Sequence, residues 1–318
     1  MAELAIPAEM TVSWFDRSFA DRLRAERMAA REATEGDVLL CFHSLPPLLK
    51  SKAKVYCYVH NPHLVGLVAK GYALTWVNLR LAIERFIARR FERNVDAYIV
   101  QTPTMRRALS RWIGDRRKGN RPPISMLPFV DHVDVPAKSD KGALPTWDFL
   151  YVSDGVVHKN HRRLFQAFKV LADEGIRPSL AVTLPDRDAE LIAELDAMVE
   201  QYGLRIVNLG HVPHDQIFEH YQQARAMMFA SYAESFGIPM LEATASGVPI
   251  LAAEMDFVRD MCVPAQTFDP FSEVSIARAI KRFLYDQEDM ITVLTPAQFV
   301  AELQALHAQS AFQKSLAS

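Results

Sequence analysis

The stretch "MMFASYAESFGIPMLEATASGVPI", residues 227–250, joins two apolar runs through a polar turn and a short helical pattern. A buried strand is predicted to end near Ser231, and Pro239 suits the first position of a helix because its missing N–H would be unpaired there. Glu234 lies in the connecting loop, and Glu242 lies about one turn into the helix. This order of strand, loop, helix and strand is typical of a parallel sheet covered by helices.

The same alternation of apolar runs and helical patterns continues along the chain in both directions. The runs predicted to be strands are 37–42, 54–59, 96–101, 124–129, 149–153, 179–184, 205–210, 226–231, 248–253 and 266–270. The helical patterns lie around 15–33, 64–93, 103–112, 160–174, 186–202, 214–224, 239–246, 273–286 and 296–312. A polar, proline-containing segment at 131–146 is interpreted as a linker. We therefore expect an α/β protein with two doubly wound domains, 1–135 and 146–290, and a C-terminal helix within 295–318 that returns to the first domain.

Ligands of doubly wound sheets bind beyond the carboxyl ends of the strands, so the loops at those ends are the first candidates for a site. The amides of Ser235, Phe236, Gly237 and Ile238 are expected to point out of the helix start and to form an anion site, which Gly237 lets a phosphate approach closely. The Glu242 carboxylate is suited to accept two hydrogen bonds from a vicinal diol such as a ribose. The competing interpretation is an ordinary helix start whose dipole is complemented by acidic residues.

Lys159 stands in a comparable place in "FLYVSDGVVHKNHRRLFQAF", residues 149–168. It follows a predicted strand and precedes a predicted helix. A cation at that position is suited to neutralise a diphosphate. Taken alone, a solvated surface lysine is the simpler interpretation.

The composition is that of a globular protein, with 50% apolar and 23% charged residues and a formal net charge of -2. Such a balance excludes a strong global attraction to nucleic acid. The three cysteines, Cys41, Cys57 and Cys262, form no CxxC pair and predict neither disulfides nor a zinc site. The sequence shows neither a signal peptide nor an apolar run of membrane-spanning length, so we expect a cytoplasmic protein.

These segments, in this order, resemble the retaining glycosyltransferases of family 4, whose GT-B fold consists of two Rossmann-like domains facing a cleft. The family signature is the Glu-x7-Glu motif, here "ESFGIPMLE" from Glu234 to Glu242. The other segments that carry the resemblance are "KNH" at 159–161, "LGHVPHDQIFEHY" at 209–221, "ASGVPILAAE" at 245–254 and "FDPFSEVSIARAI" at 268–280. The likeness is dense over 149–286 and weaker over 1–130, where it rests on strand order, an arginine-rich helix and "VHN" at 59–61.

The resemblance implies a role for each motif residue. Glu234 would face the donor sugar, Glu242 would hold the nucleotide ribose, and Ser235, Phe236 and Gly237 would lie by the phosphates. Lys159 matches the basic residue that binds the diphosphate. His60, at the end of an N-terminal strand, resembles the family's histidine near the transferred sugar, although an ordinary strand-end histidine is an alternative interpretation.

The sequence departs from the family pattern in two places. Where many members carry Gly-Arg before the lysine, this chain has Ser153 and Asp154, so a phosphate site would depend more on the amides, on Lys159 and on Arg163. Members also begin with a strand and a glycine-rich loop, and nothing similar precedes "FADRLRAERMAAREA". We therefore expect a first domain that is short by roughly one strand–loop unit.

Two further patterns in the sequence bear on function. Residues 80–121 contain 12 Lys/Arg against 4 Asp/Glu, and "NLRLAIERFIARRFERN" is amphipathic, with Leu81, Phe86, Ile87 and Phe91 among its apolar positions. This pattern favours either a solvated helix face or contact with anionic lipid at the inner membrane face. Histidine pairs with HxxH spacing occur at 60/63, 158/161 and 211/214 but lack further ligands, so no metal site is expected.

The predicted function is transfer of a sugar from a UDP- or GDP-sugar to a glycan or lipid-linked acceptor in cell-surface polysaccharide synthesis. It is predicted to proceed with retention, without a metal ion or other cofactor. The alternative is a non-catalytic nucleotide-sugar-binding protein of the same fold. A nicotinamide-dependent dehydrogenase is a weaker alternative, because no GxGxxG turn follows a strand.

Overall fold

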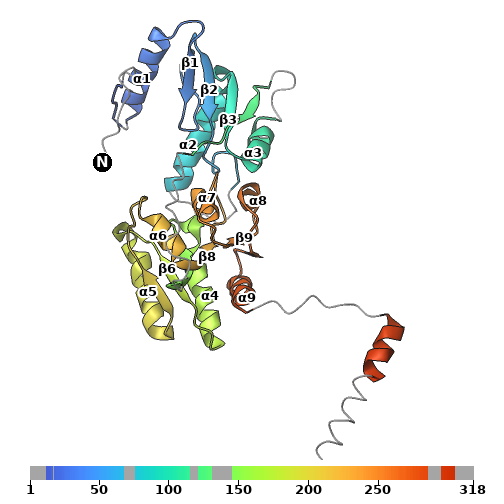
Figure 1. Cartoon of the computed structure of the whole chain (residues 1–318). Helices are drawn as coiled ribbons and strands as arrows, with labels where there is room; N and C mark the ends of the chain where they lie inside the picture. Colours follow the sequence, from blue (N-terminus) through green and yellow to red (C-terminus); the bar gives the residue numbers. More distant parts are fainter. Residues whose placement is uncertain are drawn as a thin grey trace, which may run out of the picture. The chain divides into compact units, whose positions relative to one another are not determined.

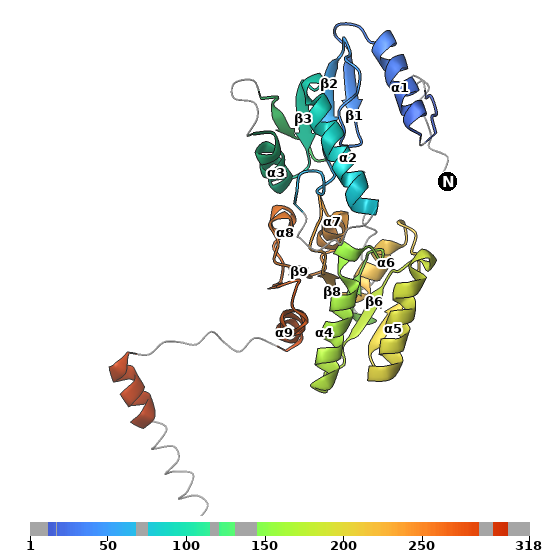
Figure 2. The ribbon, with the colours of Figure 1, turned by 180° about the vertical axis from the view of Figure 1, so that it is seen from behind.

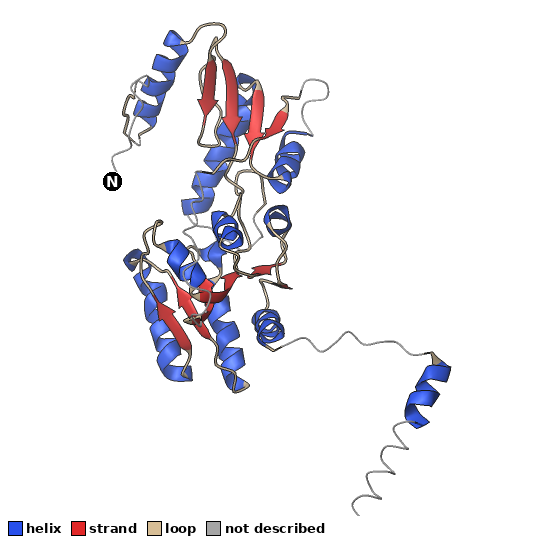
Figure 3. Cartoon of the chain, in the orientation of Figure 1, coloured by secondary structure: helices blue, strands red, loops and turns tan. Residues whose placement is uncertain are grey.

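The computed structural model describes residues 12–16, 18–67, 76–114, 121–130, 145–285 and 295–304 (Figure 1). The chain divides into two compact units, Met1–Lys281 and Arg282–Ser318. The first unit contains two separate parallel β-sheets, and their strands and helices alternate along the sequence (Figure 3). In the second unit, residues 296–304 are helical.

The N-terminal sheet has the strand order β1-β2-β3-β4, and all of its strands are parallel. Its strands are β1 (Val38–Cys41), β2 (Lys54–Tyr58), β3 (Ala97–Val100) and β4 (Ile124–Met126). The helices of this half are α1 (Phe19–Glu32), α2 (Trp76–Phe91) and α3 (Pro103–Gly114). Because successive strands are neighbours and parallel, each connection must cross back over the sheet, as α2 and α3 do.

One face of the N-terminal sheet carries the core of this half. Alternate strand residues such as Cys57 and Val100 pack there with Met105 and Leu109 of α3. The opposite face is covered less completely by the described residues, and its partly exposed side chains include Val38, Leu40, Phe42, Leu127 and Phe129. The rings of Phe42, Tyr58 and Phe129 lie against one another on it.

The C-terminal sheet has six parallel strands in the order β10-β9-β8-β5-β6-β7. They are β5 (Trp147–Tyr151), β6 (Ser179–Val182), β7 (Arg205–Asn208), β8 (Ala224–Phe229), β9 (Ile250–Ala253) and β10 (Gln266–Phe268). The helices between them are α4 (His161–Asp173), α5 (Ala189–Tyr202), α6 (Ile217–Gln222), α7 (Ile238–Ala245), α8 (Asp256–Met261) and α9 (Glu273–Leu284). Helices α4 and α5 pack side by side in both views (Figures 1 and 2). The strands β6, β8 and β9 are almost wholly buried, as expected for a sheet covered on both faces.

The ten predicted strands are all present in the predicted order. Among the predicted helices, α2 begins at Trp76 rather than near 64, because residues 62–66 form turns. Helix α8 was not predicted, since its six residues are too short to show a helical period. Most of the linker predicted at 131–146 and the end of the helix predicted at 296–312 lie outside the described residues.

Within the described residues, every helix is too short or too polar to cross a membrane.

Candidate functional site

The loops after β5 and β8 meet at one edge of the C-terminal sheet. The two strands are parallel neighbours, with Leu150 opposite Met227 in the register. From β5 the chain builds β6 and β7 on one side and then crosses to β8 on the other side. The boundary between β5 and β8 is therefore the point where strand order reverses, which is where doubly wound sheets bind ligands.

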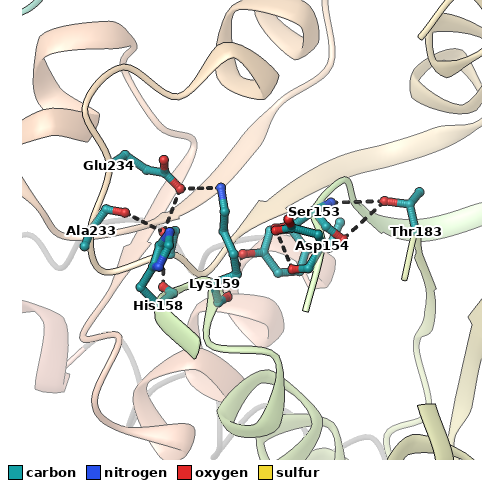
Figure 4. A network of polar contacts seen from close by, with 9 residues as sticks. Ser153, Asp154, His158, Lys159, Thr183, Ala233 and Glu234 are labelled. Carbon is teal, nitrogen blue, oxygen red and sulfur yellow. Dashed lines mark hydrogen bonds and ion pairs between the residues drawn. The ribbon is translucent and has the colours of Figure 1, made fainter. Parts of the chain in front are cut away.

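The central contact of this edge is an ion pair between Lys159 and Glu234 (Figure 4). Lys159 Nζ lies 2.5 Å from Glu234 Oε1, and the two side chains are 18% and 14% exposed. The Ser231 hydroxyl donates to the same carboxylate oxygen at 2.9 Å. The two residues predicted to meet the diphosphate and the sugar are thus brought together, and each is the partner of the other.

The loop that carries Lys159 is held by hydrogen bonds to β5 and to the segments that follow β8 and β10. The Tyr151 hydroxyl donates to the Lys159 carbonyl at 2.6 Å. Asn160 adopts a left-handed backbone with φ 66°, which asparagine tolerates better than most residues. Its side-chain amide donates to the carbonyls of Ala230, at 3.3 Å, and Pro270, at 2.7 Å. These contacts position the lysine without using its ammonium group.

The predicted anion site lies at the start of α7. Gly237 caps this helix with φ 83°, and a Cβ at that position would collide with the side chain of Met240. In the described part of the chain, the amides of Ser235, Phe236 and Gly237 have no hydrogen-bond acceptor. Phe236 is buried and Ile238 is about half exposed. Neither side chain has a hydrogen-bond donor, so the donors at this position are backbone N–H groups. An anion could therefore bind to several free N–H groups at a helix N-terminus.

Glu242 is buried, 3% exposed, inside the first turns of α7. Its Oε1 lies 2.8 Å from Nε2 of His214, and its Oε2 accepts from the Tyr221 hydroxyl at 3.0 Å. The His214 side chain is 73% exposed, whereas Tyr221 is fully buried. Each carboxylate oxygen has a second lone pair, so a diol could still bind, and the exposed His214 is the partner that could move aside. The sequence did not predict either partner of Glu242.

Arg187 partly offsets the charge of Asp154, the acidic residue in the loop after β5. Arg187 Nη2 lies 3.3 Å from Asp154 Oδ2, and both groups are exposed to solvent. The neighbouring Gly155 amide donates to Asp188 at 2.7 Å, and a Cβ at Gly155 would stand 2.7 Å from the Asp188 carboxyl carbon. The Ser153 amide donates to the Thr183 hydroxyl at 3.0 Å (Figure 4). The loop is thus tied to the residues after β6.

Arg163, which was expected to support the phosphate site, is engaged near the start of α9. Its Nη1 donates to the Phe271 carbonyl at 2.6 Å and to the Glu273 carboxylate at 2.9 Å. The contact of Arg163 with phosphate stays a prediction.

His60 follows β2 in the N-terminal half. Its amide donates to the Ser44 hydroxyl at 3.0 Å, and its Nδ1 lies 3.3 Å from the same oxygen. Burial lowers the pKa of His60, and hydrogen bonds to the Tyr58 and Phe42 carbonyls oppose that shift. His60 is therefore held neutral at pH 7, in a fixed orientation.

Two further histidines lie close to Glu234. The rings of His63 and His158 meet edge to face with centroids 5.8 Å apart. Burial lowers the pKa of each, and the nearby Glu234 carboxylate opposes the shift. In the sequence these two histidines stood out only through their HxxH spacing with other histidines. Nothing in the sequence indicated that His63 and His158, 95 positions apart, would contact each other. Among the described residues, no cluster of three or more His, Cys, Asp and Glu could hold a metal ion.

Residues 137–292 match the family described as Glycosyl transferases group 1. The O-antigen chain mannosyltransferase B of Escherichia coli is 33% identical over 109 residues, which cover 33% of this chain and 28% of that protein. The serotype-specific mannosyltransferase WbdA of Escherichia coli is 24% identical over 143 residues, covering 44% of this chain and 18% of that protein. The chain thus spans less than a third of either relative.

Among solved structures, an alpha,alpha-trehalose-phosphate synthase (UDP-forming) from Burkholderia vietnamiensis superimposes with a TM-score of 0.64 at 17% identity. The superposition covers 86% of this chain and 73% of that one. At this identity, the likeness concerns the fold alone.

Proposed function

We propose that this protein transfers a sugar from a nucleotide-sugar donor to a hydroxyl group of a glycan or a lipid-linked acceptor, because residues 137–292 match the group 1 glycosyl transferases and the chain has a GT-B fold. The transfer would retain the configuration of the anomeric carbon. The observation that carries the proposal is the meeting of Lys159, Glu234 and the free amides before α7 at the strand-order switch point.

In this proposal the donor diphosphate occupies the start of α7. The amides of Ser235 to Gly237 and the Lys159 ammonium group would stabilise the negative charge that grows on the leaving phosphate. The bond between the anomeric carbon and the diphosphate breaks, and a bond from the acceptor oxygen to that carbon forms on the same face. The acceptor proton passes to the departing phosphate oxygen, so neither a covalent sugar–protein link nor a metal ion is required.

Glu234 and Glu242 would divide the rest of the donor between them. Glu234 lies beside Lys159 and is placed to accept hydrogen bonds from sugar hydroxyls once the lysine turns toward the phosphate. Glu242 lies about one turn into α7, where it would hold the ribose. His60 would lie near the transferred sugar as a neutral hydrogen-bonding group.

The comparisons supply candidates for donor and acceptor. The solved relative from Burkholderia vietnamiensis is UDP-forming, and the two Escherichia coli relatives are mannosyltransferases, one of them of the O-antigen chain. We therefore propose a UDP- or GDP-sugar donor and a role in cell-surface polysaccharide synthesis.

An acceptor linked to lipid would be reached at a membrane surface, and α2 has the side chains for it. Leu79, Ile83 and Phe86 are 53%, 51% and 67% exposed. Their spacing places them along one side of the helix. Arg80, Arg89 and Arg90 are exposed on the same helix. An exposed apolar stripe flanked by arginines suits the surface of an anionic bilayer.

The test is a thermal-shift panel with UDP, GDP, ADP and their sugars, followed by product analysis with the donor that binds. A ligand that binds only the folded state raises its stability by mass action. We expect one nucleoside diphosphate to raise the melting temperature and its sugar to be transferred with retention. If no nucleotide shifts the melting temperature, the proposed donor site is wrong.

Nucleotide binding without turnover on any acceptor would instead favour the non-catalytic alternative. Two observations support that alternative. Asp154 places a negative charge in the loop after β5, and Lys159 is already paired with Glu234.

A further inference from the structure

A hollow lined by basic side chains lies on the N-terminal half. It has a volume of about 590 Å³ and lies between α3 and the residues that lead into β4. Four arginines contribute to its wall, Arg106, Arg107 and Arg111 from α3 and Arg121 from the facing segment. We name this hollow the arginine groove. None of its lining residues belongs to the donor site, and its volume falls within the range of small-molecule sites.

The sequence explains why the arginines gather on one side of α3. Arg107, Ser110 and Arg111 recur at intervals of three and four residues, and Arg106 precedes Ser110 by four. These positions share the outer face of the helix, while Met105 and Leu109 on the inner face are buried in the sheet core. The face turned away from the sheet is therefore basic along its length.

The positive charge of the groove is only partly balanced by the described residues. Arg107 lies 3.8 Å from Asp256 and 3.9 Å from Asp260, and it donates to the Thr104 hydroxyl at 2.8 Å. In the described part of the chain, no carboxylate is paired with Arg106, Arg111 or Arg121, and the groove lining contains neither Asp nor Glu. Over 103–124 the sequence has seven Lys/Arg and one Asp/Glu.

Arg121 is also held in place. Its Nη2 donates to the carbonyl of Gly114 at 2.5 Å, at the C-terminal end of α3. Gly114 has no side chain, and a Cβ there would stand 3.5 Å from Nη1 of Arg121. The guanidinium group thus lies directly on the end of the helix and faces the arginines of α3 across the groove. A fixed guanidinium loses less entropy when it binds a ligand.

We propose that the arginine groove binds a ligand that carries phosphate groups, presented either by a soluble phosphorylated compound or by a phospholipid headgroup. Guanidinium groups suit phosphate because their planar N–H groups donate in pairs to its oxygens. The arginines of α3 and Arg121 on the facing wall would contact a single phosphate group from both sides, or each wall would contact one of two neighbouring phosphate groups. The apolar part of the lining, which includes Ile113 and Pro123, leaves room for an uncharged part of the ligand.

The first arm of the test is calorimetric titration of the full chain with pyrophosphate, in the presence of saturating UDP so that the donor site is not counted. The variant is R106Q/R111Q/R121Q, and the matched control R24Q/R205Q/R278Q removes three exposed arginines elsewhere. We expect affinity for pyrophosphate to fall at least about tenfold in the groove variant, through loss of charge-assisted hydrogen bonds, and to stay near wild type in the control. Melting curves of all three proteins show whether each is folded.

The second arm separates the two sources of phosphate. The same proteins are sedimented with phosphatidylcholine vesicles, with and without phosphatidic acid. Weaker recovery of the groove variant on the anionic vesicles alone assigns the groove to lipid headgroups. Equal recovery of variant and wild type, together with the loss of pyrophosphate binding, assigns it to a soluble compound.

Two results would overturn the proposal. One is that the groove variant binds both pyrophosphate and anionic vesicles as wild type does, and the other is that the control loses as much binding as the groove variant. Neither result depends on sugar transfer. The comparison of the groove variant with the control can be made even if the protein binds no UDP, so failure of this proposal is distinguishable from failure of the proposed function.

Discussion

Lys159 and Glu234, 75 positions apart in the sequence, form an ion pair of 2.5 Å between the loops that follow β5 and β8. Both side chains are largely buried, so each neutralises a charge that would otherwise lie unpaired at the edge of the sheet. Under the proposed function, the pair therefore links the stability of this edge to the binding of the donor. Binding of a diphosphate would supply Lys159 with a second anionic partner and release Glu234 for the sugar.

Removal of the lysine should make this coupling measurable. Lys159→Met leaves the Glu234 carboxylate without its cation, and we expect the free energy of unfolding to fall by about 1–3 kcal/mol. The double variant K159M/E234Q should recover most of the loss, because it removes the unpaired charge. Chemical denaturation measures both. Lys169→Met, which breaks an exposed pair with Asp173, is the control and should leave the free energy of unfolding close to that of wild type. Failure of the second substitution to restore stability would contradict this account of the pair.

The two motif glutamates should differ in their effect on nucleotide affinity. If Glu242 holds the ribose, Glu242→Ala should weaken binding of the nucleoside diphosphate by roughly 1.5–3 kcal/mol, or about 10- to 150-fold. Glu234→Ala should leave that affinity nearly unchanged while sugar transfer collapses. Calorimetric titration compares the three proteins. Melting curves are needed beside it, because Glu242 also binds Tyr221 and His214. Equal affinity for the nucleoside diphosphate in all three proteins would mean that the motif is an ordinary helix start.

His161 should make the protein less stable at low pH. Burial, and secondarily the charge on Lys159, lower the pKa of His161 to about 3. An unfolded histidine titrates near 6.5, so between these values the unfolded chain binds more protons, and the free energy of unfolding falls as the pH falls. The expected contribution is about 2 kcal/mol between pH 6.5 and 5.

His161→Phe isolates this effect. Among the described residues, neither ring nitrogen of His161 has a hydrogen-bond partner, and the ring lies against Tyr151 and Phe165, so phenylalanine fits the chemistry of the site. The variant should be at least as stable as wild type at pH 7.5 and should lose less stability on acidification. Parallel pH profiles for the two proteins would exclude His161 as a source of the acid sensitivity.

Nucleotide binding should be independent of divalent metal ions. In the proposed function, the free amides before α7 and the Lys159 ammonium group would neutralise a diphosphate without a metal ion, so EDTA should leave the affinity for the nucleoside diphosphate unchanged. Titrations with EDTA and with added magnesium or manganese check this. Abolition by EDTA and recovery on addition of metal would show that the diphosphate is held in another way.

Association with anionic vesicles should depend on the exposed stripe of α2. The variant L79Q/I83Q/F86Q should be recovered with these vesicles less than wild type, because it removes apolar surface that would enter the bilayer interface. The wild-type recovery should also fall with salt, since the Debye length is about 8 Å at physiological ionic strength. V207Q/V263Q/V274Q, which changes exposed valines elsewhere, serves as the control. Equal recovery with neutral and anionic vesicles at low salt would argue against this surface.

Much of the fold was readable from the sequence because its signals are local. Apolar runs such as 179–184 and 248–253 became β6 and β9, since a strand buried on both faces needs a continuous apolar stretch. Gly237 and Pro239 likewise marked the start of α7, because a left-handed cap and a residue without an N–H fit only there. Helix α8 escaped prediction, since "DFVRDM" is shorter than two helical turns.

What the sequence determined by itself was therefore the order of strands and helices, the polar loops at the carboxyl ends of strands and the glutamate motif around α7. Only the tertiary structure decided which of these loops are neighbours. The placement of β8 beside β5 brings Glu234 to Lys159, and the turn before α6 brings His214 to Glu242. The tertiary structure likewise brings Arg121 onto the end of α3, where it joins the arginines of that helix in the arginine groove. The physical reason is that periodicity and helix caps depend on residues a few positions apart, whereas the pairing of distant side chains depends on how the sheet is assembled.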